Sequence, residues 1–102
     1  MNELKIVAWN TVTFPNATAK GFLIKLKEEL NEAMDDIENE NYAGLDRELA
    51  DIAILSISYL ARIRGKSFDD VIEEKFKVVQ SRTWGEENEN GDRKKICVGH
   101  SL

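Results

Sequence analysis

Two pairs of acidic residues stand at helical spacing in the stretch 27–57. Glu29 and Glu32 are three residues apart, and so are Glu48 and Asp51. Residues three apart on an α-helix share a face, so each pair would present two carboxylates in one direction. Fifteen residues separate the pairs, enough to end one helix, turn and begin another. Two antiparallel helices would then aim four carboxylates into one space.

Four carboxylates that lie so close repel one another unless cations lie between them. Oxygen ligands from Asp and Glu suit Mg²⁺, with Mn²⁺ as a substitute. The alternative for Glu29 and Glu32 is a solvated helix face paired with Lys25. Glu48 and Asp51 open an otherwise apolar helix, where unpaired carboxylates are costly. The two pairs together therefore predict a magnesium site.

The helix that carries the first pair should run from about residue 19 to about residue 38, with Thr18 as its N-cap. The acidic pair lies beside the apolar stripe of this helix, at the edge of the core. Lys25 and Asp36 fall in the same column, and a surface position is the alternative for Asp36. The stripe recurs at steps of four and three: Phe22, Leu26, Leu30, Ala33 and Ile37.

The second helix should start near Leu45, after a polar turn at 39–44, and end near Arg64, with Gly65 as its C-cap residue. This helix is apolar on nearly all sides, which is typical of a helix that is buried all round. One small monomer can hardly cover it, so we expect a homodimer or homotetramer. The predicted inner face consists of Leu45, Leu49, Ile52, Tyr59 and Ile63.

A third helix is predicted over about 68–82. Lys75 lies in the middle of its apolar face, and Arg82 lies two turns further along the same line. Two cations in an apolar stripe indicate an interior or a cleft, where they could hold phosphates. The alternatives are that Lys75 extends past the core to solvent and that Arg82 pairs with a surface acid.

The two ends of the chain lack helical periodicity. Residues 1–16 are predicted to be extended or irregular, because the sequence TVTF at 11–14 favours a strand-like backbone. The tail, 85–102, has a turn at Asn90 and Gly91 and a short strand-like KKICV. The predicted fold is therefore an all-α single domain, 1–102, with three main helices over about 17–84 that oligomerisation completes.

The composition limits the classes of function. A chain of 102 residues is one small domain. The net charge of −5 argues against nucleic acid as the main partner, whereas a small anionic substrate is possible if metals mask the acidic site. The single Cys97 fits a reducing cytoplasm. No signal peptide or membrane span is predicted, and the uncharged apolar run 52–61 is about half a span.

Two motifs carry a resemblance to a known family. The sequence EELNE at 28–32, followed by ELAD at 48–51, resembles the EExxE and ExxD motifs of the MazG-like all-alpha nucleoside triphosphate pyrophosphohydrolases. The flanks WNTVTFPNAT, KLKEEL, ELADIAIL and KFKVVQSRTWG look like the dATP/dGTP diphosphohydrolase branch, which includes the MazZ enzymes of some phages. The resemblance covers about 9–85.

The resemblance implies a MazG-like helical bundle and a reaction. Such enzymes cut a (d)NTP to the monophosphate and pyrophosphate with Mg²⁺, here with two or more ions per site. Lys75 and Arg82 would hold the phosphates, and Lys25 is a further phosphate-binding candidate. Val79 stands where the branch often has Asn, so that contact is either absent or made by Gln80. The metal ligands, which are also the catalytic residues, would be Glu29, Glu32, Glu48 and Asp51.

Several alternatives stay open from the sequence. Either Glu29 or Glu32 could take the proton of the attacking water, and the attacked phosphorus is not specified. The base, guanine or adenine, would stack on an aromatic group. The role would be synthesis of a modified phage genome or sanitation of the nucleotide pool, in a bacterial or host cytoplasm. The candidates for stacking are Trp9, Phe14 and Trp84. The alternative from another class is a non-catalytic helical dimerisation or adaptor module.

Overall fold

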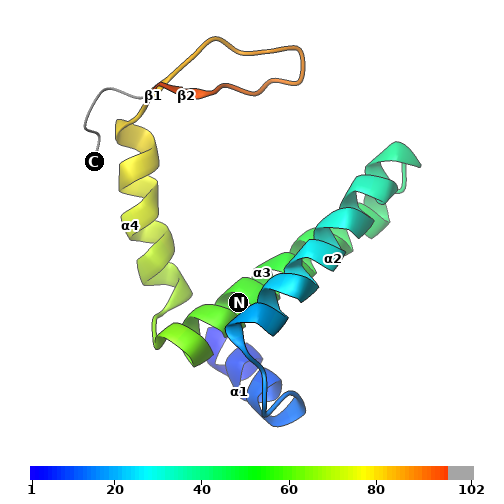
Figure 1. The fold of residues 1–102 in the computed structure, drawn as a ribbon, viewed down its shortest axis with the longest axis vertical. Coiled ribbons are helices and arrows are strands. Elements are labelled where there is room, and N and C mark those ends of the chain that lie inside the picture. Colours follow the sequence, from blue (N-terminus) through cyan, green and yellow to red (C-terminus); the bar gives the residue numbers. More distant parts are fainter. Residues whose placement is uncertain (97–102) are drawn as a thin grey trace. The chain divides into compact units, whose positions relative to one another are not determined.

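The computed structural model describes residues 1–96, which form four α-helices and a two-stranded sheet (Figure 1). The all-α prediction is confirmed. The predicted strand KKICV is present only as Lys95 and Ile96, and its last two residues, with His100, lie outside the described part. The elements are α1 (Glu3–Thr13), α2 (Ala19–Glu38), α3 (Tyr42–Arg64), α4 (Phe68–Ser81), β1 (Thr83–Trp84) and β2 (Lys95–Ile96).

Helices α2 and α3 lie side by side as a hairpin, joined by a turn at 39–41 (Figure 1). Thr18 caps α2, as predicted, and its Oγ1 accepts a hydrogen bond of 3.1 Å from the Gly21 amide. Helix α3 begins earlier than predicted because Asn41 caps it, accepting a bond of 3.1 Å from the Gly44 amide. Gly65 ends α3 in the left-handed conformation, with φ of 64°.

The contact between α2 and α3 holds both apolar and acidic side chains. Phe22 and Ala33 of α2 and Ile57 of α3 are its buried hydrophobic residues, and Phe22 meets the edge of Tyr59 at 6.0 Å between ring centroids. Glu29 is buried among them. The prediction that the acidic column lies at the edge of the core was therefore wrong for Glu29.

The apolar stripe predicted for α2 is confirmed at Phe22 and Ala33, but the observed contact is turned toward Glu29. Leu30 and Ile37 belong to the predicted stripe, yet both are exposed. On α3, Leu49 and Ile63 of the predicted inner face are exposed as well, whereas Ile57 and Ser58 are buried. Burial of Glu29 leaves Leu30 and Ile37 of α2 outside, because neighbouring residues of a helix point about 100° apart.

The prediction of an extended or irregular N-terminus was wrong, because Glu3–Thr13 form helix α1. Asn2 caps it, since its Oδ1 accepts a hydrogen bond of 3.0 Å from the Lys5 amide. Thr11 fits the helix by donating from Oγ1 to the carbonyl of Val7, at 2.8 Å. Packing of α1 against α3 then outweighs the weak preference of its β-branched residues for strands.

The chain divides into two compact units, Met1–Asp69 and Asp70–Leu102. In the second unit, β1 and β2 pair antiparallel, with Thr83 opposite Ile96 and Trp84 opposite Lys95. The predicted turn is confirmed at Gly91, whose φ is 76°. No residue of α4 is buried, whereas the sequence predicted an inner apolar face for this helix. None of the helices described in residues 1–96 is long and apolar enough to cross a membrane.

Candidate active site

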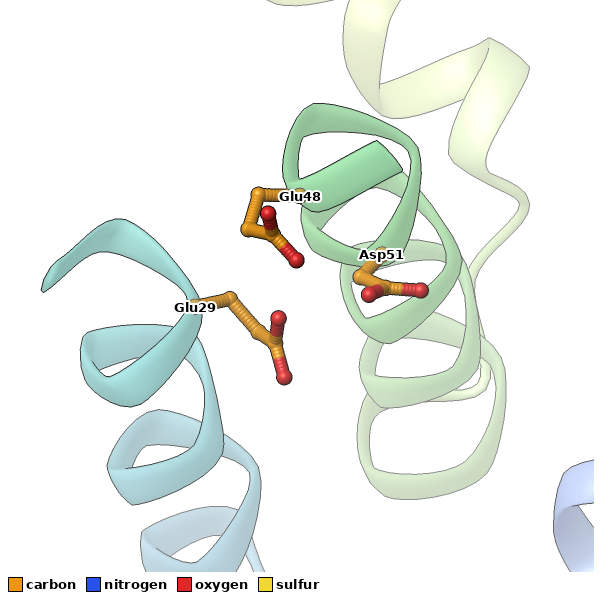
Figure 2. Close-up of side chains that lie close together, drawn as sticks. All are labelled: Glu29, Glu48 and Asp51. Atoms are coloured by element: carbon orange, nitrogen blue, oxygen red, sulfur yellow. The ribbon is translucent and has the colours of Figure 1, made fainter. Parts of the chain in front are cut away.

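Three carboxylates meet where α2 faces α3 (Figure 2). Glu29 comes from α2, and Glu48 and Asp51 come from α3. One carboxylate oxygen of each lies within 4.8 Å of those of the other two. Glu29 is buried, Glu48 is half-buried and Asp51 is exposed, so the cluster opens to solvent on the side of Asp51. These three residues, hereafter the acid cluster, could hold a divalent cation.

Two further acids contact the acid cluster. Glu32, the fourth predicted ligand, is exposed and forms a carboxyl–carboxyl hydrogen bond with Glu29. Asp36, for which the sequence left a surface position open, is half-buried and forms the corresponding bond with Glu48. Such a bond between two carboxyl groups requires a proton on one of them. The acids are therefore close enough to share protons when no cation neutralises them.

The pKa values follow from this crowding. Burial raises the pKa of Glu29, the charges of Glu32 and Asp51 raise it further, and the charge of Lys25 opposes them. The pKa of Glu48 rises from 4.5 to about 7, first through its hydrogen bond with Asp36, then through burial and neighbouring negative charges. Cations that bind to the cluster compete with these protons.

Two oxygens at the acid cluster accept no hydrogen bond from an amide, amine or hydroxyl group of residues 1–96. They are Glu29 Oε2 and Asp36 Oδ2, and both are fully enclosed. A buried carboxylate oxygen without a donor costs free energy unless a proton or a cation reaches it. The donor set consists only of carboxylate oxygens, as Mg²⁺ and Mn²⁺ prefer. The residues present therefore fit a divalent metal ion.

The turn between α2 and α3 holds Asp36 in place. Asn41, the N-cap of α3, donates from Nδ2 to Asp36 Oδ1 at 3.2 Å while its Oδ1 accepts from Gly44. A Cβ atom on Gly44 would come to 2.8 Å from Asp36 Oδ2, so only glycine leaves room for this approach. Asn41 thus links the start of α3 to the position of Asp36. Through Asp36 it also influences the position of Glu48.

A pocket of about 610 Å³ adjoins the acid cluster. Glu29 and Asp51 line one part of it, and Trp9 and Phe14 line another, with their rings edge to face at 5.8 Å. Lys25 also lines the pocket and pairs with Glu28 at 3.4 Å. The volume lies in the range of pockets for small molecules and cofactors. The structure thus brings two predicted base-stacking residues and one predicted phosphate-binding lysine to the acid cluster.

The remaining predicted site residues lie in the second unit. Lys75 is exposed on α4, and Arg82 is half-buried just after this helix. Trp84 lies on β1, where its Nε1 donates to the carbonyl of Val79 at 3.3 Å. The phosphate-binding role of Lys75 and Arg82 and the base-stacking role of Trp84 stay predictions.

Sequence reasoning missed two residues beside the pocket. Asn10 is only 3% exposed and lines the pocket, and Arg62 of α3 donates to its Oδ1 at 2.6 Å. Asn10 lies within the segment predicted to be extended, so no helical face was assigned to it. For Arg62, a signal was available: it is a charged residue directly after the uncharged run 52–61, near the end of its helix.

The helical hairpin, its acid cluster and the adjoining pocket have the character of an all-α nucleotide pyrophosphohydrolase, as the EExxE and ExxD motifs predict. Residues 4–100 match the model of one such family, the dATP/dGTP pyrophosphohydrolases, and the chain belongs to it. The protein is therefore an enzyme, a nucleotide diphosphohydrolase, and not the non-catalytic adaptor considered as an alternative. No curated protein and no solved structure matches the chain significantly.

Proposed function

We propose that the protein converts a purine deoxynucleoside triphosphate, dGTP or dATP, to the monophosphate and pyrophosphate, with Mg²⁺ as its cofactor. The observation that carries this proposal is the continuity between the acid cluster and the aromatic residues Trp9 and Phe14 in one pocket. A triphosphate needs cations and a base needs an apolar, stackable surface. One pocket that offers both suits a whole nucleotide. The natural setting that we propose is the cytoplasm.

Glu29, Glu48 and Asp51 would hold the metal, with Glu32 beside them. Two or more Mg²⁺ ions, or Mn²⁺ ions in their place, would neutralise the triphosphate and lower the pKa of a bound water. The enclosed oxygen Glu29 Oε2, which no donor in the described chain reaches, supports this assignment. Because their charges repel, the carboxylates from α2 and α3 would be stabilised by the positive charge of the ion that they hold.

The other residues of the pocket would bind and orient the substrate. Trp9 and Phe14 would stack on the base, and Lys25 would approach the phosphates. Either Glu29 or Glu32 would take the proton of the attacking water. Glu29 is buried in the contact between α2 and α3, and Glu32 is exposed beside it, so both carboxylates border the place where the water would be held.

A hydrolysis panel tests the proposal. Pyrophosphate release would be measured with dGTP, dATP, dCTP, dTTP and GTP, each with Mg²⁺ and with EDTA. We expect Mg²⁺-dependent release from at least one purine deoxynucleotide and much slower release from dCTP and dTTP. The deoxynucleoside monophosphate should appear in the same amount as pyrophosphate. Pyrophosphate from none of the five, at neutral pH with Mg²⁺ or Mn²⁺, would end the proposal.

We also propose that the enzyme works as a homo-oligomer, a dimer or a tetramer. Among the described residues, only Phe22, Ala33 and Ile57 are buried hydrophobic residues, which is a small core for a folded domain. An exposed apolar stripe runs along the outer side of α2, outside this core, with residues at steps of seven, four and three. It consists of the exposed residues Leu23, Leu30, Met34 and Ile37. A second copy of the chain would cover this stripe.

Met34→Glu should shift the protein toward monomer, because a carboxylate in the subunit contact would lose its hydration. Sedimentation velocity across a concentration series measures the state. Val12→Glu, the same kind of change at an exposed residue of α1, is the matched control and should leave the oligomer intact. A wild-type protein that sediments as a monomer at all concentrations would contradict the proposal.

A further inference from the structure

We propose that Asn10 selects the base by donating a hydrogen bond into the pocket, and that this donor favours guanine over adenine. The inference rests on the proposed function and specifies its substrate. Asn10 lines the same pocket as Trp9 and Phe14, the residues proposed to stack on the base. It is almost fully buried, at 3% exposure, yet its side chain is polar. A buried polar group next to an apolar surface is the usual means of orienting a ligand.

Arg62 fixes the orientation of the Asn10 amide. Its Nη1 donates to Asn10 Oδ1 at 2.6 Å and to the Asn10 backbone carbonyl at 3.3 Å. A guanidinium group has no acceptor, so the oxygen of the amide must face it, and the opposite amide rotamer is excluded. Arg62 is itself held over the ring of Phe22, 6.0 Å from the ring centroid.

The nitrogen of the Asn10 amide is the group left for a ligand. Within residues 1–96, no hydrogen bond from Nδ2 is formed, and Nδ2 is not among the fully enclosed unpaired atoms. It therefore keeps a small exposed area in a residue that contacts solvent through the pocket. Since Asn10 lines the pocket together with Trp9 and Phe14, the inference assigns this N–H as the donor that a base in the pocket would meet.

This donor distinguishes the two purines. Guanine has two adjacent acceptors, O6 and N7, whereas adenine has the acceptor N7 beside the donor N6. A free Asn side chain can serve adenine with its oxygen and nitrogen together. Because Arg62 occupies the oxygen of Asn10, the acceptor half of that pair is lost. The amide then matches the O6 and N7 edge of guanine and opposes the N6 amino group of adenine.

The first arm of the test uses the unaltered enzyme with four deoxynucleoside triphosphates: those of guanine, hypoxanthine, adenine and 2,6-diaminopurine. Hypoxanthine has the O6 and N7 acceptors of guanine without its 2-amino group. The base 2,6-diaminopurine keeps the 2-amino group and N7 but has the 6-amino group of adenine in place of O6. We expect kcat/KM for guanine and hypoxanthine to be similar and about tenfold above the other two, the effect of one partly buried hydrogen bond. Equal rates with guanine and adenine, or a hypoxanthine substrate as poor as adenine, would overturn the inference.

The second arm reverses the polarity at residue 10. Asn10→Asp keeps an oxygen for Arg62 and replaces the donor by an acceptor of the same size. The ratio of kcat/KM for dGTP to that for dATP should fall by about tenfold or more, and the ratio cancels any general effect of the added charge. Asn2→Asp is the matched control, since Asn2 caps the same helix, the change adds the same charge, and Asp preserves the N-cap.

The third arm tests Arg62 as a positioning residue. Arg62→Met frees the Asn10 amide to rotate, so the ratio of kcat/KM for dGTP to that for dATP should approach one. Arg62→Lys should retain most of the preference for dGTP. Circular dichroism checks that each variant is folded. An unchanged dGTP to dATP ratio in folded Asn10→Asp would overturn the role of Asn10 while leaving the proposed function standing. Failure of the unaltered enzyme on every nucleotide would instead refute the function itself.

Discussion

Glu48→Gln and Asp51→Asn should each lower kcat for purine deoxynucleotide hydrolysis by at least about a hundredfold. Mutation of groups that merely support metal ligands costs about 10- to 100-fold, so loss of a ligand should cost more. The amides are nearly isosteric with the carboxylates, and Glu48 and Asp51 repel neighbouring acids in the metal-free fold. We therefore expect folded proteins whose melting temperatures in EDTA are unchanged or higher.

The measurement combines steady-state hydrolysis with thermal melts in EDTA and in Mg²⁺. The wild type should gain stability from Mg²⁺, because a ligand of the native state raises its melting temperature, and the two variants should gain much less. Asp46→Asn is the matched control: it removes a charge from α3 at an exposed position outside the acid cluster. Full activity in both variants, with a normal response to Mg²⁺, would contradict the assignment of the cluster.

The second large effect concerns pH. The pKa of Glu48 is raised from 4.5 to about 7, so between these values the folded protein holds a proton that the unfolded chain has lost. This stabilising contribution is fully present below 4.5 and disappears as the pH rises through about 7. Glu29 acts in the same direction, since its pKa is raised as well. In EDTA, the free energy of unfolding should therefore fall from pH 5 toward pH 8.

Mg²⁺ should reverse this trend. A metal ion binds the deprotonated carboxylates, so its apparent affinity should increase from pH 6 to pH 8. Thermal melts across this range, with EDTA and with Mg²⁺, measure both effects. Glu48→Gln cannot titrate at this position and should flatten the decline in EDTA, and the difference in slope between wild type and variant isolates Glu48 from the other carboxyl groups. Identical slopes for the two proteins would show that Glu48 has an ordinary pKa.

Local sequence signals were sufficient for the hairpin that carries the acid cluster. The spacing of the apolar residues and the capping residue Thr18 predicted α2 with the bounds that the structure shows. The three-residue spacing of Glu48 and Asp51 placed both on one face of α3, toward Glu29. These features depend on helical periodicity, which neighbours in the chain determine.

The features that the sequence could not predict depend on contacts between distant residues. Helix α1 has β-branched residues in its last turn and no clear apolar stripe, so its packing on α3 decides its conformation. The pair Asn10 and Arg62 is separated by 52 positions. The side of α2 that faces α3 was predicted in part: Phe22 and Ala33 of the stripe are buried, whereas Leu30 is exposed and Glu29 is buried in its place. Only the assembled hairpin shows this turn of the helix.

The short turn at 39–41 has a consequence for anyone who would engineer the enzyme. Its tip is exposed, so it looks suitable for inserting an epitope tag or a circular-permutation cut. Asn41, however, holds the start of α3 and Asp36 at the same time. Lengthening this connection would disturb both. At the tip of the second hairpin, the backbone amides of Asn90 and Gly91 bond to Asn88 of the same turn. An inserted tag should therefore be placed at Asn90 and Gly91 rather than at 39–41.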